Sequence, residues 1–162
     1  MRYDLYWDDF KPGDRFETGG ITVTEDQIIE YALDWDPQPF HIDAEVGRAH
    51  PFGTVFASGF HTLSLLFRLF AQEGVIGKCS YAGAGLSLKW LKPVMPGDTI
   101  RGVFEVTETR PLKSKPHLGS LRMTHLGINQ NDETVIDVDC THIIRKRPAD
   151  EDRPWDFEAA AS

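Results

Sequence analysis

Apolar residues recur with helical spacing in two parts of the chain, and the first part lies near the N-terminus. Thr24 and Gln27 form a capping-box pattern, in which each side chain satisfies a free N–H at the start of a helix. We predict a helix over about residues 25–35, which Pro37 and Pro39 end because proline lacks a backbone donor and restricts its predecessor. One or two further turns are expected in "IDAEVGRA". The apolar positions behind the capping box are Ile28, Ile29, Ala32 and Leu33.

The second helical stretch is apolar on nearly all sides. It begins after Ser58, a residue type favoured as an N-cap, and ends where Gly74 and Gly77 interrupt the pattern. A helix without a polar face has to be buried, so we predict that it lies at the centre of the molecule. Its apolar positions are Phe60, Leu63, Leu65, Leu66, Phe67, Leu69 and Phe70.

Alternating apolar and polar residues predict strands in much of the remaining chain. A short β-branched run over residues 21–24 precedes the first helix, and "LSLKWL", "TIRGVFEVT", "SLRMTHLGIN" and "VIDVDCTHII" follow the second. In "SLRMTHLGIN" the apolar phase moves from Leu121 and Met123 to Leu126 and Ile128, which predicts a β-bulge near Thr124. In the last strand, one face carries Ile136, Val138, Cys140 and His142.

One wholly apolar helix and several antiparallel strands predict an α+β fold, in which the sheet wraps around a long central helix. The sheet face that the helix does not cover needs another cover, and a partner subunit is the simplest one. We expect a single domain over residues 1–147. Residues 148–162 are acidic and broken by proline, which is typical of a flexible tail.

Composition excludes several classes of function. The formal net charge of -8 argues against broad binding of nucleic acid or of an anionic membrane. The two cysteines, Cys79 and Cys140, form no CxxC pair, so neither a disulfide framework nor a zinc site is expected. The opening "MRYDLYWDDF" carries acids where a signal peptide has basic and then apolar residues, and "FHTLSLLFRLF" is too short to span a bilayer. We therefore expect a cytoplasmic protein.

The segment "DPQPFH" holds the pair of residues best suited to proton transfer. Asp36 and His41 flank two prolines, which stiffen the segment and hold flanking side chains in fixed positions. A structural interpretation stays open, in which Asp36 caps a turn and His41 is a partly buried polar residue. The functional interpretation is a preorganised acid–base pair.

The sequence around this pair resembles a known family. "YALDWDPQPFHIDAEVGRA" is similar to the hydratase-2 motif of the MaoC-like dehydratases, F-A-x-x-S/T-G-D-x-N-P-x-H-x-D, with Asp36, Pro39, His41 and Asp43 at the matching positions. "FASGFHT" resembles the start of that family's central helix, and "LKWLKPVMPGDTI" resembles its P-V-x-x-G-D-T strand and turn. Three motifs in the same order are more specific than any one of them. The resemblance covers roughly residues 5–146.

The resemblance implies a hot-dog fold and an (R)-specific enoyl-CoA hydratase or 3-hydroxyacyl-CoA dehydratase, a hydro-lyase. It implies that Asp36 and His41 are catalytic and that Gly59 offers its N–H to the thioester carbonyl, with Ser58 and Phe40 as further substrate-binding residues. Coenzyme A would enter as part of the acyl-CoA substrate, with no separate cofactor and no metal. A homo-oligomer, either a dimer or a dimer of dimers, is expected.

The sequence departs from the family motif beside the catalytic pair. Gln38 replaces Asn, Trp35 replaces Gly and Tyr31 replaces Phe, and the preceding helix is one residue shorter. These changes affect the expected shape of the acyl pocket. A hot-dog thioesterase and a non-catalytic acyl-CoA-binding protein remain alternatives, although the spacing of the acid, the histidine and the glycine favours the hydratase.

Other polar residues are assigned structural roles. His61 is expected to face solvent or an interface, and the set His41, Asp43 and His50 lacks the spacing of a zinc site. Lys113 and Lys115 could meet coenzyme A phosphates, but a charged hairpin loop is more often a solvated surface. The remaining histidines expected to be structural are His117, His125 and His142.

Overall fold

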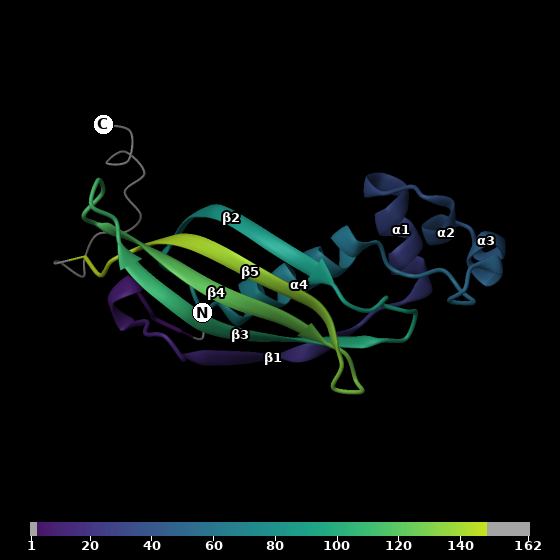
Figure 1. The fold of residues 1–162 in the computed structure, drawn as a ribbon, viewed down its shortest axis with the longest axis horizontal. Helices are drawn as coiled ribbons and strands as arrows, with labels where there is room; N and C mark the ends of the chain where they lie inside the picture. The colour runs from purple at the N-terminus through teal and green to yellow at the C-terminus, as the bar shows by residue number, and fades with distance from the viewer. Residues whose placement is uncertain (1–2, 149–162) are drawn as a thin grey trace.

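The computed structural model describes residues 3–148, and a five-stranded antiparallel sheet curves around the long helix α4 (Figure 1). Residues 149–162, which make up nearly all of the predicted tail, lie outside the described residues. The strands follow the order β1-β3-β4-β5-β2, so β1 and β2 are the edges. The strands are β1 (Arg15–Thr22), β2 (Ser80–Trp90), β3 (Thr99–Pro111), β4 (Leu118–Ile128) and β5 (Thr134–Arg145). The predicted α+β arrangement is confirmed.

The helices occupy two places in this fold. A short 3-10 helix, η1 (Trp7–Asp9), packs against β4, and helices α1, α2 and α3 gather at one end of the molecule (Figure 1). None of the helices between residues 3 and 148 has the length and apolar character needed to cross a membrane. The α-helices are α1 (Glu25–Trp35), α2 (Pro39–Ile42), α3 (Ala44–Ala49) and α4 (Gly59–Glu73).

Helix α4 begins and ends as its sequence predicts. The Ser58 hydroxyl accepts a hydrogen bond from the Phe60 N–H at 3.2 Å, and Gly74 ends the helix with φ at 75°, a left-handed conformation that glycine adopts without strain. Leu66 and Phe70 are buried against the sheet, but the Phe60 side chain is 54% exposed. The prediction of burial on all sides is therefore wrong for the start of the helix, because the sheet covers only one side of it.

The turn "PGD" fixes the entrance to α1. Val23 donates to the Asp98 carbonyl at 2.8 Å, and Gly97 donates to the Val23 carbonyl at 2.7 Å. The next residue, Thr24, forms the predicted capping box with Gln27 at the start of α1. The end of the sheet thus determines where α1 starts.

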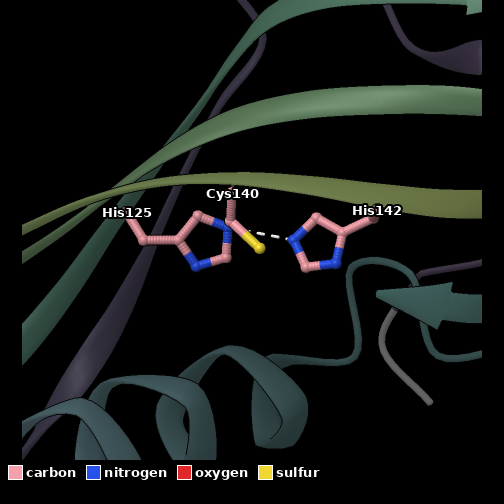
Figure 2. Close-up of side chains that lie close together, drawn as sticks. All are labelled: His125, Cys140 and His142. Atoms are coloured by element: carbon pink, nitrogen blue, oxygen red, sulfur yellow. Dashed lines mark hydrogen bonds between the residues drawn. The ribbon is translucent and has the colours of Figure 1, made fainter. Parts of the chain in front are cut away.

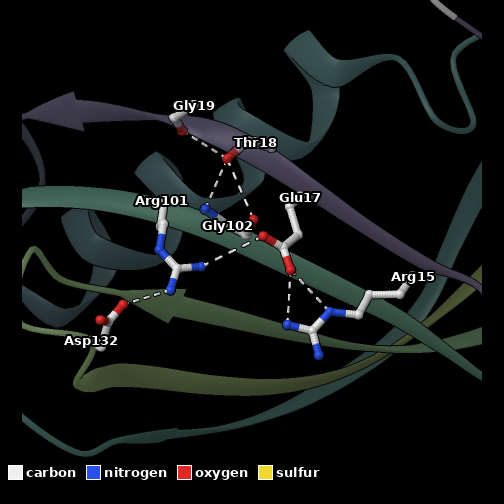
Figure 3. A network of polar contacts seen from close by, with 7 residues as sticks. All are labelled: Arg15, Glu17, Thr18, Gly19, Arg101, Gly102 and Asp132. Carbon is white, nitrogen blue, oxygen red and sulfur yellow. Dashed lines mark hydrogen bonds and ion pairs between the residues drawn. The ribbon is translucent and has the colours of Figure 1, made fainter.

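Strand β1 begins earlier than the β-branched run predicted, and a register shift after Glu17 interrupts its pairing with β3. Figure 3 shows how side chains satisfy the backbone at this irregularity. The Thr18 hydroxyl accepts from the Gly102 N–H and donates to the Gly19 carbonyl, both at 2.8 Å. Beside it, Arg101 pairs with Asp132 at 2.9 Å. The strand therefore bends without leaving this N–H unsatisfied.

One local prediction is wrong. The bulge expected near Thr124 is absent, because the pairing of β4 with β3 is uninterrupted around that residue. The register shift in this part of the sheet lies in β3, after Val106. His125 is fully buried and keeps the same β4 face pointing inward, so a polar residue continues the core pattern there. The proline segment also forms a helix, α2, because Pro39 stands at its first position, where no backbone donor is needed.

Candidate active site

The two proline-flanked residues converge at the end of α1. Asp36 caps α1, with its N–H donating to the Ala32 carbonyl at 2.9 Å, and His41 lies in the single turn of α2. Chain reversal between these helices brings the His41 Nε2 within 3.6 Å of the Asp36 Oδ2. The His41 side chain is buried and the Asp36 carboxylate remains partly exposed. A buried imidazole thus faces a carboxylate that solvent and ligands can reach.

A backbone contact sets the orientation of the imidazole. The His41 Nδ1 lies 2.7 Å from the Phe56 carbonyl oxygen, which only accepts hydrogen bonds. The Nδ1 therefore carries a proton and donates it to Phe56. Consequently the Nε2, which faces Asp36, is the nitrogen that can gain or lose a proton during a reaction.

Two further side chains hold the carboxylate. The Ser58 hydroxyl donates to the Asp36 Oδ2 at 2.6 Å, and the Gln38 amide donates to the Oδ1 at 2.9 Å. The Ser58 hydrogen bond is the largest cause of a lowered Asp36 pKa, and Gln38 and His41 lower it further, while partial burial acts in the opposite direction. Asp36 is therefore ionised at neutral pH and available as a base.

The Asp36–His41 pair lies in the wall of a cavity of about 480 Å³. This volume is in the range of sites that hold small ligands. The cavity-lining residues are mostly apolar, with a few polar groups among them, a composition suited to a ligand that has an apolar chain and a polar head. The apolar lining residues are Phe52, Phe56, Ala57, Phe60, Trp90, Leu91, Pro93 and Val94.

The N-terminus of α4 reaches the same cavity through Gly59. Its N–H donates to no acceptor among residues 3–148, and the dipole of α4 favours negative charge at this end. The Trp90 indole lies directly over Gly59, and its Nε1–H donates to the Gly59 carbonyl at 2.9 Å. A Cβ at residue 59 would lie 2.5 Å from the indole, so the close approach of Trp90 requires glycine.

The other predicted substrate-binding residues lie behind the cavity wall. Ser58 is fully buried and contacts Asp36, and it does not line the cavity. Phe40 stacks on Phe56 with ring centroids 5.4 Å apart and packs edge-on against His41, which it supports from behind. Of the two places expected for His61, solvent or an interface, solvent is wrong, because this ring is buried and stacked on Tyr31 at 4.4 Å.

Several contributors to the site were missed from the sequence. The Phe56 carbonyl carries no side-chain signal, and Gln38 was considered only as a departure from the motif. Trp90 was assigned to the alternating pattern of a strand. Its position at the end of that strand, within the segment that resembles the family's P-V-x-x-G-D-T motif, could have suggested that it lines a cavity. Asp43 caps α3 through the Glu45 N–H at 2.7 Å, and His50 packs among the rings of Phe40, Phe52 and Phe56.

Comparison with known protein families shows which family this chain belongs to. The family model described as "MaoC like domain" matches residues 9–127, which include the helical end, the Asp36–His41 pair and the first helical turn of α4. The chain belongs to the MaoC-like domain family. An uncharacterized protein of Bacillus subtilis, YdeM, is 31% identical over 140 residues, covering 86% of this chain and 98% of that protein. The relation therefore extends over nearly the whole MaoC-like domain.

Relatives with a named reaction are similar over a shorter stretch. The 3-hydroxyacyl-thioester dehydratase Z of Mycobacterium tuberculosis is 36% identical over 98 residues, or 57% of this chain and 63% of that protein. Among solved structures, the MaoC-like dehydratase from Rhodospirillum rubrum is 33% identical, with a TM-score of 0.82 over 89% of this chain and 99% of that one. These similarities associate the MaoC-like domain with a family of dehydratases.

A more distant structure tests the fold prediction. The (R)-hydratase PhaJ1 from Pseudomonas aeruginosa superposes with a TM-score of 0.69 at 21% identity, over 94% of this chain and 96% of that one. At this identity the likeness concerns the fold alone. The sheet wrapped around α4 is the predicted hot-dog fold.

Proposed function

We propose that this MaoC-like domain is a hydro-lyase that adds water reversibly to a trans-2-enoyl thioester and forms an (R)-3-hydroxyacyl thioester. The observation that carries the proposal is the 3.6 Å approach of Asp36 and His41 in the wall of a mainly apolar cavity. Water addition to a conjugated thioester requires a base and an acid: an ionised carboxylate can be the base, and an imidazole that carries a second proton on its Nε2, beside that carboxylate, can be the acid.

The catalytic pair would hold one water molecule. In the hydration direction, Asp36 accepts a proton from this water while the water oxygen bonds to C3 of the enoyl group. The electron pair of the C2–C3 double bond moves toward the thioester carbonyl, and the His41 Nε2–H delivers a proton to C2. The proton on Asp36 then returns to His41, which restores the pair. Dehydration follows the same steps in reverse.

The thioester oxygen gains negative charge in this reaction and needs a donor. Gly59 supplies an N–H at the edge of the cavity, at the positive end of the α4 dipole. An N–H in this position is already oriented before the charge develops, so its reorganisation costs little free energy.

Ser58 and Phe40 are assigned positioning roles in place of the direct substrate contacts predicted from the motif. Ser58 keeps Asp36 ionised and oriented, and Phe40 supports the His41 ring. The apolar side chains that line the cavity would then make the direct contacts with the substrate. Acyl specificity would depend on Phe52, Phe60 and Trp90, which line it.

The active form is proposed to be a homodimer whose sheets pair along the β2 edges. This edge strand and its end expose Leu86, Trp90 and Leu91 by about half of their surface, next to the half-exposed Phe60. Burying these side chains would stabilise the pair through the hydrophobic effect. The cavity, lined by Phe60, Trp90 and Leu91, would then lie at the subunit boundary.

A panel of trans-2-enoyl-CoA substrates of varied chain length and branching, followed at the enoyl absorbance, tests the function. We expect loss of the enoyl chromophore with at least one substrate and its recovery from the matching 3-hydroxyacyl thioester. Acyl-carrier-protein thioesters form a second arm that separates the two carriers.

Two outcomes would contradict the hydro-lyase assignment. Release of free thiol with the enoyl chromophore intact would identify a thioesterase. Binding of the thioesters without turnover of any of them would identify a binding protein.

A further inference from the structure

Two buried histidines and a cysteine meet on the inner face of the sheet, behind helix α4. Strand pairing explains how they come together, since Cys140 and His142 share one face of β5 and His125 lies on the inward face of β4. The side chains of His125 and His142 lean toward each other until their Nε2 atoms are 3.2 Å apart. Figure 2 shows the Cys140 sulfur between the two imidazole rings. All three are buried, and one ligand atom from each lies within 4.8 Å of the others.

We propose that His125, Cys140 and His142 form a binding site for a borderline-soft divalent cation of the Zn²⁺ type. Two imidazole nitrogens and one thiolate are ligands that zinc prefers. This proposal departs from the expectation of no metal, and it does not depend on the hydro-lyase function.

The distance between the two nitrogens fits a shared metal ion. Zinc–imidazole bonds of about 2.0–2.1 Å at tetrahedral angles place two nitrogens about 3.3–3.4 Å apart. The Nε2 atoms of His125 and His142 are already at 3.2 Å, so an ion could bond to both with little movement of the rings. In a tetrahedral site the sulfur would lie about 3.6 Å from each nitrogen, and it now lies within 4.8 Å of both.

Metal binding would require protons to move on the histidines and to leave the cysteine. Burial lowers the pKa of His125 to about 3, with a smaller contribution from His142, and burial lowers the pKa of His142 to about 4, so both imidazoles are neutral. One Nε2–H now donates to the other ring, and metal binding would move that proton to the Nδ1 of its own ring. Burial raises the pKa of the Cys140 thiol to about 11, so the ion must displace its proton, and one proton leaves per ion bound.

One nitrogen of the cluster faces away from the proposed ion. The Nδ1 of His125 is buried and has no hydrogen-bond partner in the part of the chain that the structure describes. The proposed ion bonds to the Nε2 atoms, so this Nδ1 would stay without a partner, as the Nδ1 of His61 does outside the cluster. The surroundings are otherwise aromatic, with Phe70 and Phe104 packed within 5.0 Å of the His125 ring centroid.

An adjoining cavity offers access and a further coordination position. Its volume is about 550 Å³, and both Cys140 and His142 line it, together with Ser80 and glycines of the β2 edge. Water entering this cavity could complete a four-coordinate ion. The site would therefore resemble zinc centres with three protein ligands and one open position.

Titration of the chelator-treated full chain with Co²⁺ and then Zn²⁺ tests the site. We expect one Co²⁺ per chain with a thiolate-to-cobalt charge-transfer band, displacement of the Co²⁺ by Zn²⁺, release of one proton per ion and a higher melting temperature. Cys140→Ser and His142→Leu should lose the band and the stoichiometric uptake. Cys79→Ser is the matched control, because Cys79 is the other buried cysteine and its thiol contacts the Ile76 carbonyl at 3.6 Å, outside the cluster.

The proposal is overturned if the wild-type chain shows no charge-transfer band. It is also overturned if Cys140→Ser keeps the band or Cys79→Ser loses it. Circular dichroism and melting of each metal-free variant identify any that fails to fold, and for such a position Cys140→Ala and His125→Leu replace it in the same titration. Metal uptake without the band would be binding at exposed carboxylates and would count against the site.

Discussion

Asp36 and His41 act on the same water in the proposed reaction, so their substitutions should behave as one unit. Asp36→Asn and His41→Ala should each lower turnover by about two to four orders of magnitude, because each removes a general acid–base group. The double variant should lose little more than either single variant. Steady-state rates with the best enoyl-CoA of the panel, and melting curves for all three variants, are the measurements. A single variant with near wild-type turnover would remove that residue from the mechanism.

Ser58 acts on Asp36 through one hydrogen bond and should affect the pH profile. Ser58→Ala removes the largest cause of the lowered Asp36 pKa, so that pKa should rise. Asp36 must be ionised to act as a base, and the acid limb of kcat/KM should therefore move to higher pH. Loss of the N-cap should also lower the stability by about 1 kcal/mol.

Ser64→Ala is the matched control for this prediction. Ser64 lies on the same helix but is exposed, and its hydroxyl is 3.1 Å from that of Tyr31. Its removal should leave the acid limb in place. An acid limb that stays unchanged in Ser58→Ala would show that Ser58 only caps the helix.

At the scale of the element, two variants of Gly59 at the start of α4 can distinguish the role of its N–H from its packing against Trp90. Gly59→Pro removes the N–H, whereas Gly59→Ala keeps it, and both add a Cβ that meets Trp90. Proline is tolerated at the first helical position, and the extended conformation of Ser58, with ψ at 144°, suits a residue before proline. Turnover of the proline variant should be lower than that of the alanine variant by the equivalent of about 3 kcal/mol.

Adding Trp90→Leu to both the Gly59→Pro and the Gly59→Ala variants shows whether a clash with the indole obscures the difference in turnover between them. The difference between the proline and alanine variants should persist there, because it depends on the N–H and not on the ring. Equal turnover of two folded variants would leave Gly59 with a packing role only.

At the scale of the whole molecule, the exposed apolar edge predicts self-association. Light scattering at micromolar concentration should give at least twice the chain mass of 18.3 kDa. A charge on the β2 edge, such as Leu86→Lys, should shift the population toward the monomer by opposing burial of this edge. The monomer mass for the wild-type chain would contradict the proposed dimer.

The buried histidines should make the metal-free fold sensitive to acid. In the folded chain the pKa values of His125 and His142 are about 3 and about 4, below the ordinary 6.5. At pH values between these and 6.5, the unfolded chain therefore binds more protons than the folded chain. Their contribution to stability is complete above about pH 6.5 and is lost as the pH falls. Between pH 7 and pH 5 each should cost about 2 kcal/mol of unfolding free energy.

Denaturant unfolding in the presence of a chelator measures this loss. His125→Leu and His142→Leu should each reduce the difference between pH 7 and pH 5. His61, whose pKa burial also lowers, adds to the same slope in all variants. An unfolding free energy equal at the two pH values would contradict the neutral, buried state of the pair.

The sequence by itself determined the elements whose information is local. The capping box of Thr24 and Gln27, the N-cap Ser58 and the terminal Gly74 are short-range signals, and the helices that they predict have the expected ends. The motif also singled out Asp36 and His41, which the fold brings within 3.6 Å of each other. Such features depend on hydrogen bonds between residues a few positions apart, so they can be predicted from the sequence alone.

Only the tertiary structure decided which distant groups meet. The contact of Ser58 with Asp36, the Phe56 carbonyl on His41 and Trp90 over Gly59 join separate elements, and their alignment depends on packing. His125 appeared to break the pattern of β4, and the register of β4 with β5 brought it to Cys140 and His142 instead. Pairing register is set by the whole sheet, because a shift of one residue exchanges the inner and outer faces of a strand.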